Sequence, residues 1–383
     1  MTDWTTTRAA MAADHDRLAA VLGRPPRLHA GLWALRLYRV GHWLHRRGHK
    51  TPARLLWSFN LLLTGADLEC AVVIGPGCVM RKPRGVIMYG AIGPDCTLGT
   101  QCGVGGLLRG APAPRGERGL RPDVGARCVL GDRSLVLGSA VIGDDCTITA
   151  GCTVLQDLPA GSTIERRPGA WRTMRMGLHR RPRPAHAGDA TLGAVIRTDV
   201  ARSVMENAGT HAAVGAIRFW AHLILPAVQG VVLFRLAHAL HARGWRRAAA
   251  LLARINTKVY GLTIHPGSRI GPGIFIPHTV GVSFCGSAGP LLSLFPFCSV
   301  GPGTWPGLRS DLPADAPVLG TDVGIGAQAE VVGAVTLGDL VLVGVQARVE
   351  RDIAEGLTVV PRPNWHHVPP PADIAGMQPQ AAN

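Results

Sequence analysis

Residues 319–349 read LGTDVGIGAQAEVVGAVTLGDLVLVGVQARV. Every sixth residue of this stretch is aliphatic, and the series is Leu319, Ile325, Val331, Leu337, Val343 and Val349. A period of six fits neither the 3.6-residue period of a helix nor the simple alternation of an ordinary strand. It is typical of a solenoid whose very short strands are joined by tight turns and stacked coil upon coil. The stretch therefore predicts a narrow prism with an aliphatic interior.

Three other stretches carry the same period. Their aliphatic or small positions are Val124, Leu130, Val136, Ile142, Ile148 and Val154; Leu68, Ile74, Met80, Val86, Ile92, Leu98 and Val104; and Ile264, Ile270, Ile276, Val282, Ala288, Leu294 and Val300. Two irregular segments interrupt the rhythm, at Gly106–Asp123 and Thr304–Pro317. These segments must leave the coil, and such excursions often carry function.

The chain also repeats itself at a longer distance. The segment His42–Gly48 (HWLHRRG) returns 196 positions later as His238–Gly244 (HALHARG), and Ile74-Gly75-Pro76-Gly77 returns as Ile270-Gly271-Pro272-Gly273. Each copy begins with apolar residues at helical spacing and then enters the six-residue period. We therefore expect two equivalent domains, each consisting of helices followed by a prism.

The expected boundaries follow from these patterns. The first copy is predicted at 1–168, with helices in 1–64 and the prism in 66–168. An Arg- and Pro-rich linker follows at 169–189, and the second copy occupies 190–366, with helices in 190–260 and the prism in 262–362. Residues 367–383 are predicted to be a flexible tail.

The cysteines match this architecture. Seven of the nine occupy the small, inward position of a hexapeptide: Cys78, Cys96, Cys102, Cys128, Cys146, Cys152 and Cys298. They are expected to fill the core as free thiols, because no CxxC pair or zinc-ligand spacing is present. The sequence predicts no metal. Free thiols and the absence of a leader at Met1–Trp4 predict a cytoplasmic protein.

The formal net charge of +15 raises the possibility of a nucleic-acid partner. However, the densest run of arginines, from Arg166 to Arg183, lies mostly in the predicted linker and lacks aromatic stacking platforms. We therefore expect no nucleic-acid partner, and a cationic surface would attract an anionic cofactor instead. The longest apolar stretch, Phe219–Phe234, is too short to span a bilayer, so no membrane contact is expected either.

Four segments of the second copy resemble serine O-acetyltransferases. Residues 234–238 (FRLAH) are similar to the Arg-x-Ala-His helix of that family, and residues 261–271 (GLTIHPGSRIG) are similar to its entry into the β-helix. Residues 273–282 (GIFIPHTVGV) resemble the segment with the catalytic histidine, and residues 324–327 (GIGA) resemble a coil of the cofactor groove. The resemblance implies a mainly β fold with helical segments: two left-handed parallel β-helices of hexapeptide repeats, each preceded by α-helices.

The resemblance also implies a reaction. It implies acetyl transfer from acetyl-CoA to the hydroxyl of serine or a related small acceptor, with His278 as general base. It places Gly303, Gly326 and Ala327 along the acetyl-CoA groove. Because the thioester supplies the leaving group, no metal is implied. The family further implies a homotrimer and a role in cysteine biosynthesis.

The chain departs from the family pattern at several positions. Pro277 stands where the family has an acidic residue before the catalytic histidine, and Asp315-Ala316-Pro317 stands where a second histidine is expected. In the first copy the histidine position is Lys82, which predicts that this copy is not catalytic, because a lysine of ordinary pKa is protonated. The C-terminus lacks the terminal isoleucine by which relatives dock to cysteine synthase, so that partner is not expected.

Two alternatives remain open at this point. The acceptor could be a sugar, another hydroxy amino acid or a carrier-bound hydroxyl instead of serine. Alternatively, the chain could be a non-catalytic scaffold or regulatory subunit that pairs with an active acetyltransferase. An acceptor panel distinguishes the first alternative, and the effect of His278→Ala on turnover distinguishes the second.

Overall fold

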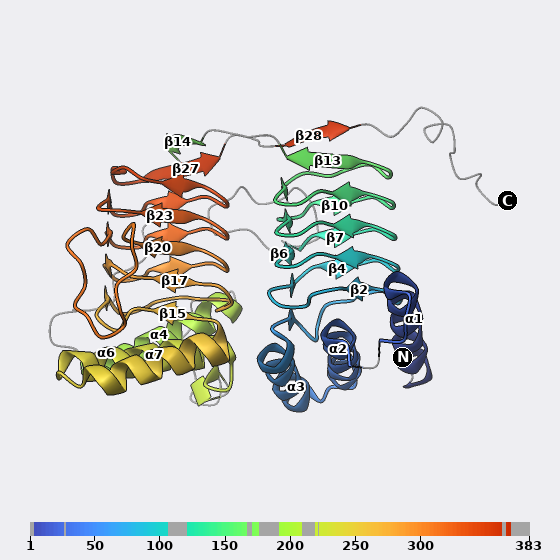
Figure 1. Ribbon diagram of the computed structural model, residues 1–383, viewed down its shortest axis with the longest axis horizontal. Helices are drawn as coiled ribbons and strands as arrows, with labels where there is room; N and C mark the ends of the chain where they lie inside the picture. Colours follow the sequence, from blue (N-terminus) through green and yellow to red (C-terminus); the bar gives the residue numbers. More distant parts are fainter. Residues whose placement is uncertain are drawn as a thin grey trace. The chain divides into compact units, whose positions relative to one another are not determined.

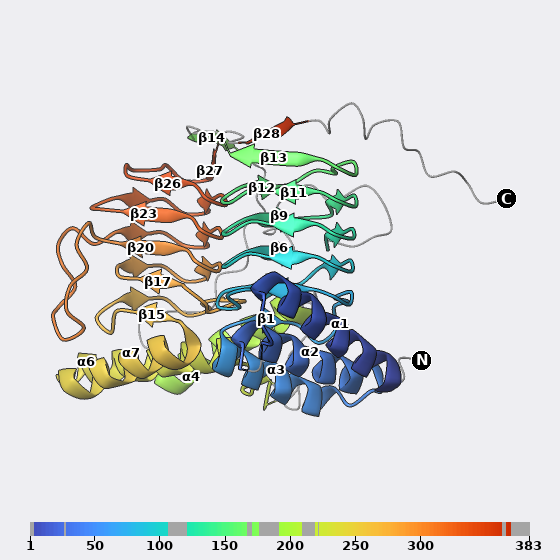
Figure 2. The same ribbon diagram turned by 45° about the vertical axis from the view of Figure 1, so that its right-hand side comes forward.

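The computed structural model describes residues 4–26, 28–105, 121–166, 171–175, 191–208, 219–220, 222–361 and 365–368. The chain forms two compact units: unit 1 comprises Met1–Gly169 with Pro363–Asn383, and unit 2 comprises Ala170–Arg362. Each unit starts with helices and continues into a stack of short parallel strands (Figure 1, Figure 2). Each stack is a left-handed parallel β-helix, so the predicted fold class is confirmed.

The helices stand at the beginning of each unit. Unit 1 contains α1 (Trp4–Leu22), α2 (Ala30–Arg46) and α3 (Lys50–Thr64). Unit 2 contains α4 (Leu192–Ala208), α6 (Pro226–Ala242) and α7 (Arg246–Tyr260). Both α3 and α7 end at a glycine in the left-handed conformation, which is the usual way to leave a helix. No helix among the described residues combines the length and apolar character needed to cross a membrane.

Three parallel sheets form the faces of each prism. In unit 1 the first is β1 (Asp67–Leu68), β3 (Ile87–Met88), β6 (Gly103–Gly105), β9 (Leu135–Leu137) and β12 (Thr153–Val154). The second is β4 (Ala91–Ile92), β7 (Asp123–Val124) and β10 (Val141–Ile142). The third is β2 (Val79–Met80), β5 (Thr97–Leu98), β8 (Val129–Leu130), β11 (Thr147–Ile148), β13 (Thr163–Arg166) and β28 (Trp365–Val368).

Unit 2 repeats the arrangement. The β15 sheet consists of β15 (Thr263–Ile264), β17 (Ser283–Phe284), β20 (Ser299–Gly301), β23 (Glu330–Val332) and β26 (Arg348–Val349). The β16 sheet consists of β16 (Arg269–Ile270), β18 (Ser287–Ala288), β21 (Val318–Leu319) and β24 (Thr336–Leu337). The β19 sheet consists of β19 (Ser293–Leu294), β22 (Gly324–Ile325), β25 (Leu342–Val343), β27 (Leu357–Pro361) and β14 (Trp171–Arg175).

The core of each prism is the aliphatic series of the six-residue period. In unit 2, Leu319, Ile325 and Val331 are buried, as are the later members of the series. Ile325 pairs with Val343 on the next coil, eighteen residues on, because three hexapeptides complete one turn of the prism. All nine cysteines lie among the described residues, and all are buried without forming a disulfide, which confirms their role as core fillers.

The last strands differ from the predicted boundaries. β28 belongs to unit 1, where it pairs antiparallel with β13, although residues up to 366 were expected in the second copy. β14 lies in the predicted linker but pairs antiparallel with β27 of unit 2. Each prism therefore ends in one antiparallel strand that covers the edge of its last parallel strand. Most of the predicted linker and the tail from 369 lie outside the described residues.

Candidate active site

His278 lies in a turn that is held against the end of α7. The turn follows Ile276 of the first coil and leads into β17, and the His278 side chain is half-buried. The Thr279 hydroxyl donates to the Tyr260 carbonyl at 2.6 Å, and the Gly281 N–H donates to the Gly261 carbonyl at 3.0 Å. Because Thr279 is buried, these two bonds fix the backbone on either side of the histidine.

Successive turns stack above this one. The Phe297 N–H donates to the Val280 carbonyl at 3.1 Å, the Gln328 N–H to the Pro296 carbonyl at 3.0 Å and the Gln346 N–H to the Ala327 carbonyl at 2.9 Å. The column consists of residues 277–281, 295–298, 326–329 and 344–347, all leading from the β19 sheet to the β15 sheet, and is called the His278 corner. It forms one edge of the prism.

The structure places two of the three predicted cofactor residues on this edge. Gly326 and Ala327 belong to the His278 corner, separated from the histidine by the turn at 295–298. A Cβ at Gly326 would lie 2.8 Å from the Gly344 carbonyl carbon, so stacking of the coils already requires glycine there. Gly303 lies elsewhere: it follows β20 and is exposed, with no atom within 4 Å of an added Cβ.

The His278 corner carries no formal charge in its own sequence. Its four turns read PHTVG, FPFC, GAQA and GVQA, without an Asp, Glu, Lys or Arg. The Cys298 thiol is fully buried, and burial raises its pKa to about 12, so it is not a thiolate nucleophile at neutral pH. Burial also raises the pKa of the Tyr260 hydroxyl. Of the side-chain types in these four turns, imidazole is the one that ordinarily serves as a general base at neutral pH, and His278 supplies it.

A second histidine serves a different purpose. His265 is buried where the β15 sheet turns toward the β16 sheet; its Nδ1 accepts from the Gly267 N–H at 3.1 Å, and its Nε2 lies 3.1 Å from the Gly307 carbonyl. This pattern fits a neutral imidazole with its proton on Nε2. Burial lowers the pKa of His265, in agreement with that state. The sequence prediction that His265 is structural matches this environment.

Gly307 belongs to the loop that interrupts the prism. Residues 302–317 connect β20 to β21, as the broken period at Thr304–Pro317 predicted. Asp311 of the loop accepts from Arg246 of α7 at 2.7 and 2.9 Å, and its Oδ1 lies 3.7 Å from Nε2 of His241. The family resemblance predicted a second histidine where Asp315 stands. Asp315 lies in this loop and not on the His278 corner.

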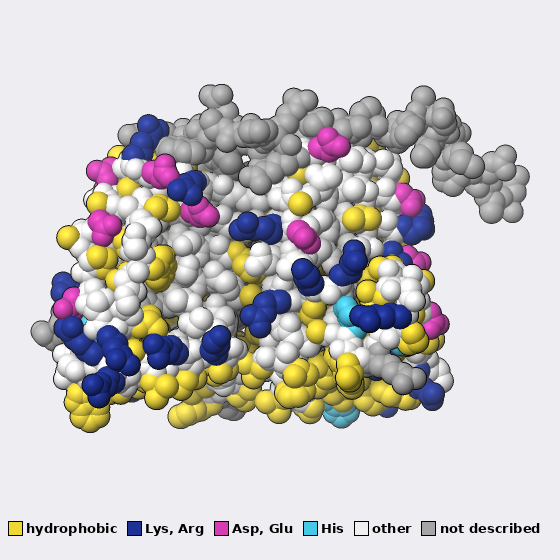
Figure 3. Space-filling model, viewed as in Figure 1, with side chains coloured by type: hydrophobic (Ala, Val, Ile, Leu, Met, Phe, Trp, Pro, Cys, Tyr) yellow, Lys and Arg dark blue, Asp and Glu magenta, His cyan; other side chains and the backbone are white. Residues whose placement is uncertain are grey.

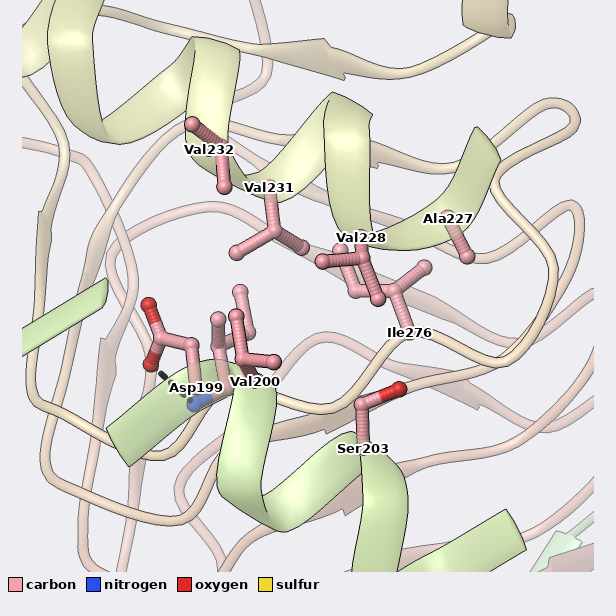
Figure 4. Close-up of a pocket in the computed structure, with 9 residues that line it drawn as sticks. Asp199, Val200, Ser203, Ala227, Val228, Val231, Val232 and Ile276 are labelled. Carbon is pink, nitrogen blue, oxygen red and sulfur yellow. Dashed lines mark hydrogen bonds between the residues drawn. The ribbon is translucent and has the colours of Figure 1, made fainter. Parts of the chain in front are cut away.

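A buried ion pair fixes the first coil to the helices. Asp199 of α4 and Arg235 of α6 are almost fully buried and pair at 2.8 Å. Arg235 also donates to the Ile270 and Gly271 carbonyls, while Asp199 accepts from the Gly273 and Ile274 N–H groups at 2.7 and 3.0 Å. Figure 4 shows Asp199 beside a small cavity whose other walls are mainly apolar side chains, among them Val228, Val231 and Ile276. The carboxylate is thus fully engaged in positioning the coil that carries His278.

Unit 1 contains the same ion pair. Asp14 of α1 pairs with Arg39 of α2 at 3.0 Å, and Arg39 donates to the Ile74 and Gly75 carbonyls. One turn later on each helix, Arg17 donates to the Gly77 carbonyl and Arg202 donates to the Gly273 carbonyl. Sequence reasoning missed Asp14, Arg17, Asp199 and Arg202 because these helices are offset by 185 positions instead of 196. The shared Asp-x-x-Arg spacing was the available signal.

Unit 1 differs at the position equivalent to His278. Lys82 occupies it and is exposed, and the following Pro83 is buried. Glu69 replaces His265; its carboxylate lies 3.7 Å from Arg121, whose guanidinium stacks 4.8 Å above the Tyr89 ring. Unit 1 therefore has a histidine at neither of the positions equivalent to His278 and His265.

The chain is similar in sequence to serine acetyltransferases. A serine acetyltransferase of Helicobacter pylori is 36% identical over 141 residues, which cover 36% of this chain and 79% of the relative. A serine acetyltransferase of Mycobacterium tuberculosis is 31% identical over 148 residues, covering 38% of this chain and 59% of the relative. No family model matches the chain.

Solved structures of serine acetyltransferases are also similar. Serine acetyltransferase 1 of Entamoeba histolytica, in complex with L-cysteine, is 26% identical with a TM-score of 0.36, covering 43% of this chain and 60% of that chain. The enzyme of Neisseria gonorrhoeae is 21% identical with a TM-score of 0.39, covering 50% of this chain and 72% of that chain. Sequence identity together with coverage of the Helicobacter relative shows that the chain belongs to the serine acetyltransferase family of acyltransferases.

Proposed function

We propose that unit 2 transfers an acetyl group from acetyl-CoA to the hydroxyl of serine or a related small acceptor, with His278 as general base. The observation that carries this proposal is the His278 turn. It presents an imidazole on a backbone fixed by Thr279 and Gly281, and the equivalent turn of unit 1 presents Lys82. A rigid turn supports catalysis because a general base must be held within hydrogen-bond reach of the proton that it removes.

The reaction needs one proton to move twice. The imidazole of His278 accepts the proton of the acceptor hydroxyl while the oxygen attacks the thioester carbonyl. The tetrahedral intermediate carries an oxyanion, for which backbone N–H groups at the prism edge are the expected donors. When the intermediate collapses, the C–S bond breaks, and the imidazolium returns the proton to the departing CoA thiolate. No metal enters this scheme.

The acetyl-CoA groove is proposed at two edges of the prism. Ala327 and Gly326 lie on the His278 corner, whereas Gly303 lies in the loop that leaves the prism after β20. A homotrimer in which the loop of one chain faces the His278 corner of the next would bring the three residues to one groove. The small side chains leave room for a pantetheine arm, and the net charge of +15 favours an anionic cofactor.

A neutral acceptor is the second candidate, and the composition of the His278 corner favours it. Free serine carries an ammonium and a carboxylate group, and buried or partly buried charges require partners. The four turns of the corner supply none, and Pro277 replaces the expected acidic residue. A sugar hydroxyl, or a hydroxyl on a carrier, makes no such demand. Serine therefore requires counter-charges from outside these four turns, whereas a neutral acceptor does not.

The test is release of free CoA thiol from acetyl-CoA over a panel of acceptors: serine, other hydroxy amino acids and neutral sugars. The full chain is expected to release thiol with at least one acceptor, and His278→Ala is expected to reduce turnover by about 10²–10⁴-fold. Lys82→Ala is the matched control, because it changes the equivalent turn of unit 1, and is expected to retain activity. Unchanged turnover in His278→Ala would contradict the proposed base.

A further inference from the structure

Equivalent helices of the two units expose equivalent apolar residues. Leu55, Phe59 and Leu63 follow one another at four-residue spacing on α3, and Leu251, Ile255 and Val259 occupy the corresponding positions on α7. All six side chains are between 39% and 59% exposed. Residues at i, i+4 and i+8 line one side of a helix. These six residues are called the apolar helix faces.

The helices turn their small residues inward instead. On α7 the buried positions are Ala249, Ala250, Ala253 and Asn256. About half of each large apolar side chain is therefore left facing outward, although exposure of apolar area to water is unfavourable. Exposed apolar residues that share one side of a helix mark a contact surface.

The charges carried by α3 and α7 themselves are of one sign. Arg247, Arg254 and Lys258 are exposed on α7, and Lys50 and Arg54 are exposed on α3. In contrast, the sequence contains no Asp or Glu anywhere in 28–66 or in 207–262. Figure 3 shows hydrophobic side chains gathered over the helices of each unit, with Lys and Arg side chains on the same view. Each of the two helix faces is therefore both apolar and cationic.

On α7 the exposed apolar residues and the basic residues occupy separate strips along the helix. At 100° per residue, Leu251, Ile255 and Val259 form a strip between the buried side and the edge that carries Arg254 and Lys258. A helix with an apolar strip bordered by basic residues is suited to lie in the plane of a lipid surface, with aliphatic groups among the acyl chains and cations at the phosphates.

We propose that the apolar helix faces of α3 and α7 dock onto an anionic lipid bilayer surface. A second copy of this chain is the competing occupant, but it would bring another acid-free, cationic helix to each face. Like charges would then face each other without a counter-charge. Anionic headgroups supply that counter-charge, and acyl chains accept the leucines and Phe59. The observations therefore favour lipid over self-association.

This proposal replaces the sequence-based expectation of no membrane contact. That expectation considered only whether an apolar segment is long enough to span a bilayer. The fold adds that α3 and α7 leave their large apolar residues outside each unit, next to basic residues. The proposal is independent of the acetyl-transfer reaction.

The test is flotation of the full chain with vesicles of phosphatidylcholine alone or mixed with phosphatidylglycerol. A face variant combines Leu55→Glu, Phe59→Glu, Leu251→Glu and Ile255→Glu. A matched control places the same four charges on exposed apolar residues of the prisms: Val73→Glu, Val129→Glu, Leu155→Glu and Val318→Glu. Circular dichroism and thermal melting check that both variants fold.

The unmodified chain and the prism control are expected to float with the anionic vesicles, and the face variant is expected to bind about tenfold or more weakly. Neutralising Arg247, Arg254 and Lys258 with glutamine is expected to weaken binding about fivefold for each basic residue. High salt should also weaken binding of the unmodified chain to the vesicles. This tests the electrostatic contribution to binding without any substitution.

Three results would overturn the proposal. One is failure of the unmodified chain to bind phosphatidylglycerol vesicles. Another is undiminished binding by the face variant. The third is a molar mass in light scattering that falls in the face variant but not in the prism control, which would assign the apolar helix faces to a second copy of this chain.

Discussion

The two units share their supports and differ in their reactive groups. Asp14–Arg39 in unit 1 and Asp199–Arg235 in unit 2 are buried ion pairs that bind equivalent carbonyl groups of the first coil. At the turn that ends that coil, unit 2 has His278 and unit 1 has Lys82. One set of residues holds the prism on its helices, and a different residue is available for proton transfer. The second can be replaced, as in unit 1, without loss of the fold.

The largest effect on stability is expected at the shared ion pairs. Replacing Arg235 with methionine leaves the Asp199 carboxylate buried without its partner, which costs about 3–5 kcal/mol of unfolding free energy. Arg39→Met should cost unit 1 a similar amount, because Asp14 is equally buried. Urea unfolding of both variants measures the two costs. A large cost in one unit and none in the other would show that the supports are not equivalent.

A glycine in the His278 turn should produce the next effect. Gly281 has φ of +70°, and a Cβ there would lie 2.4 Å from the Phe297 ring. Gly281→Ala is expected to destabilise unit 2 by about 2–3 kcal/mol and to reduce acetyl transfer by shifting the turn. Gly333 is the control, since its φ is +91° and no atom lies within 4 Å of an added Cβ. Gly333→Ala should cost about 1 kcal/mol and leave activity unchanged; equal effects would contradict the role of the Phe297 contact.

The smallest effect concerns pH. Burial lowers the pKa of His265 and of His241, so both rings bind protons more readily in the unfolded chain than in the folded one. Their stabilising contribution is present above the unfolded value of about 6.5 and is lost as the pH falls toward the lowered folded values.

Thermal melting at pH 7.5 and 5.5 measures this dependence. We expect acidification to lower the melting temperature by about 2–4 °C through these two rings. His265→Asn should reduce the pH dependence of melting while lowering stability at neutral pH, because the bond to Gly307 is lost. A pH dependence unchanged in this variant would show that other groups, among them His238 and His42, account for it.

Much of the fold could be predicted from the sequence. The six-residue period is a direct consequence of a three-sided coil, so Leu319, Ile325 and Val331 could be assigned to the core without coordinates. Cys298 was assigned by the same period. The terminal strands could not be assigned this way, because β14 and β28 pair antiparallel with distant partners and carry no periodic signal.

The candidate site was only partly predictable. His278 could be selected because its neighbours match a family segment, and its half-buried position is consistent with a reactive role. Gly303 and Gly326 have the same residue type, but only the structure shows that Gly326 is required by stacking and that Gly303 is exposed with no close neighbour. Asp199 and Arg202 were missed because α4 does not follow the 196-residue offset, and only the structure shows that this helix binds a coil some 70 residues away.

Reciprocal exchange of the two equivalent turns tests the central claim most directly. His278→Lys, Lys82→His and the double variant are compared by thiol release from acetyl-CoA with the best acceptor of the panel. The account predicts that His278→Lys lowers turnover by about 10²–10⁴-fold, that Lys82→His retains it, and that the double variant remains as inactive as His278→Lys. Full turnover in His278→Lys, or its restoration in the double variant, would contradict the assignment of catalysis to unit 2.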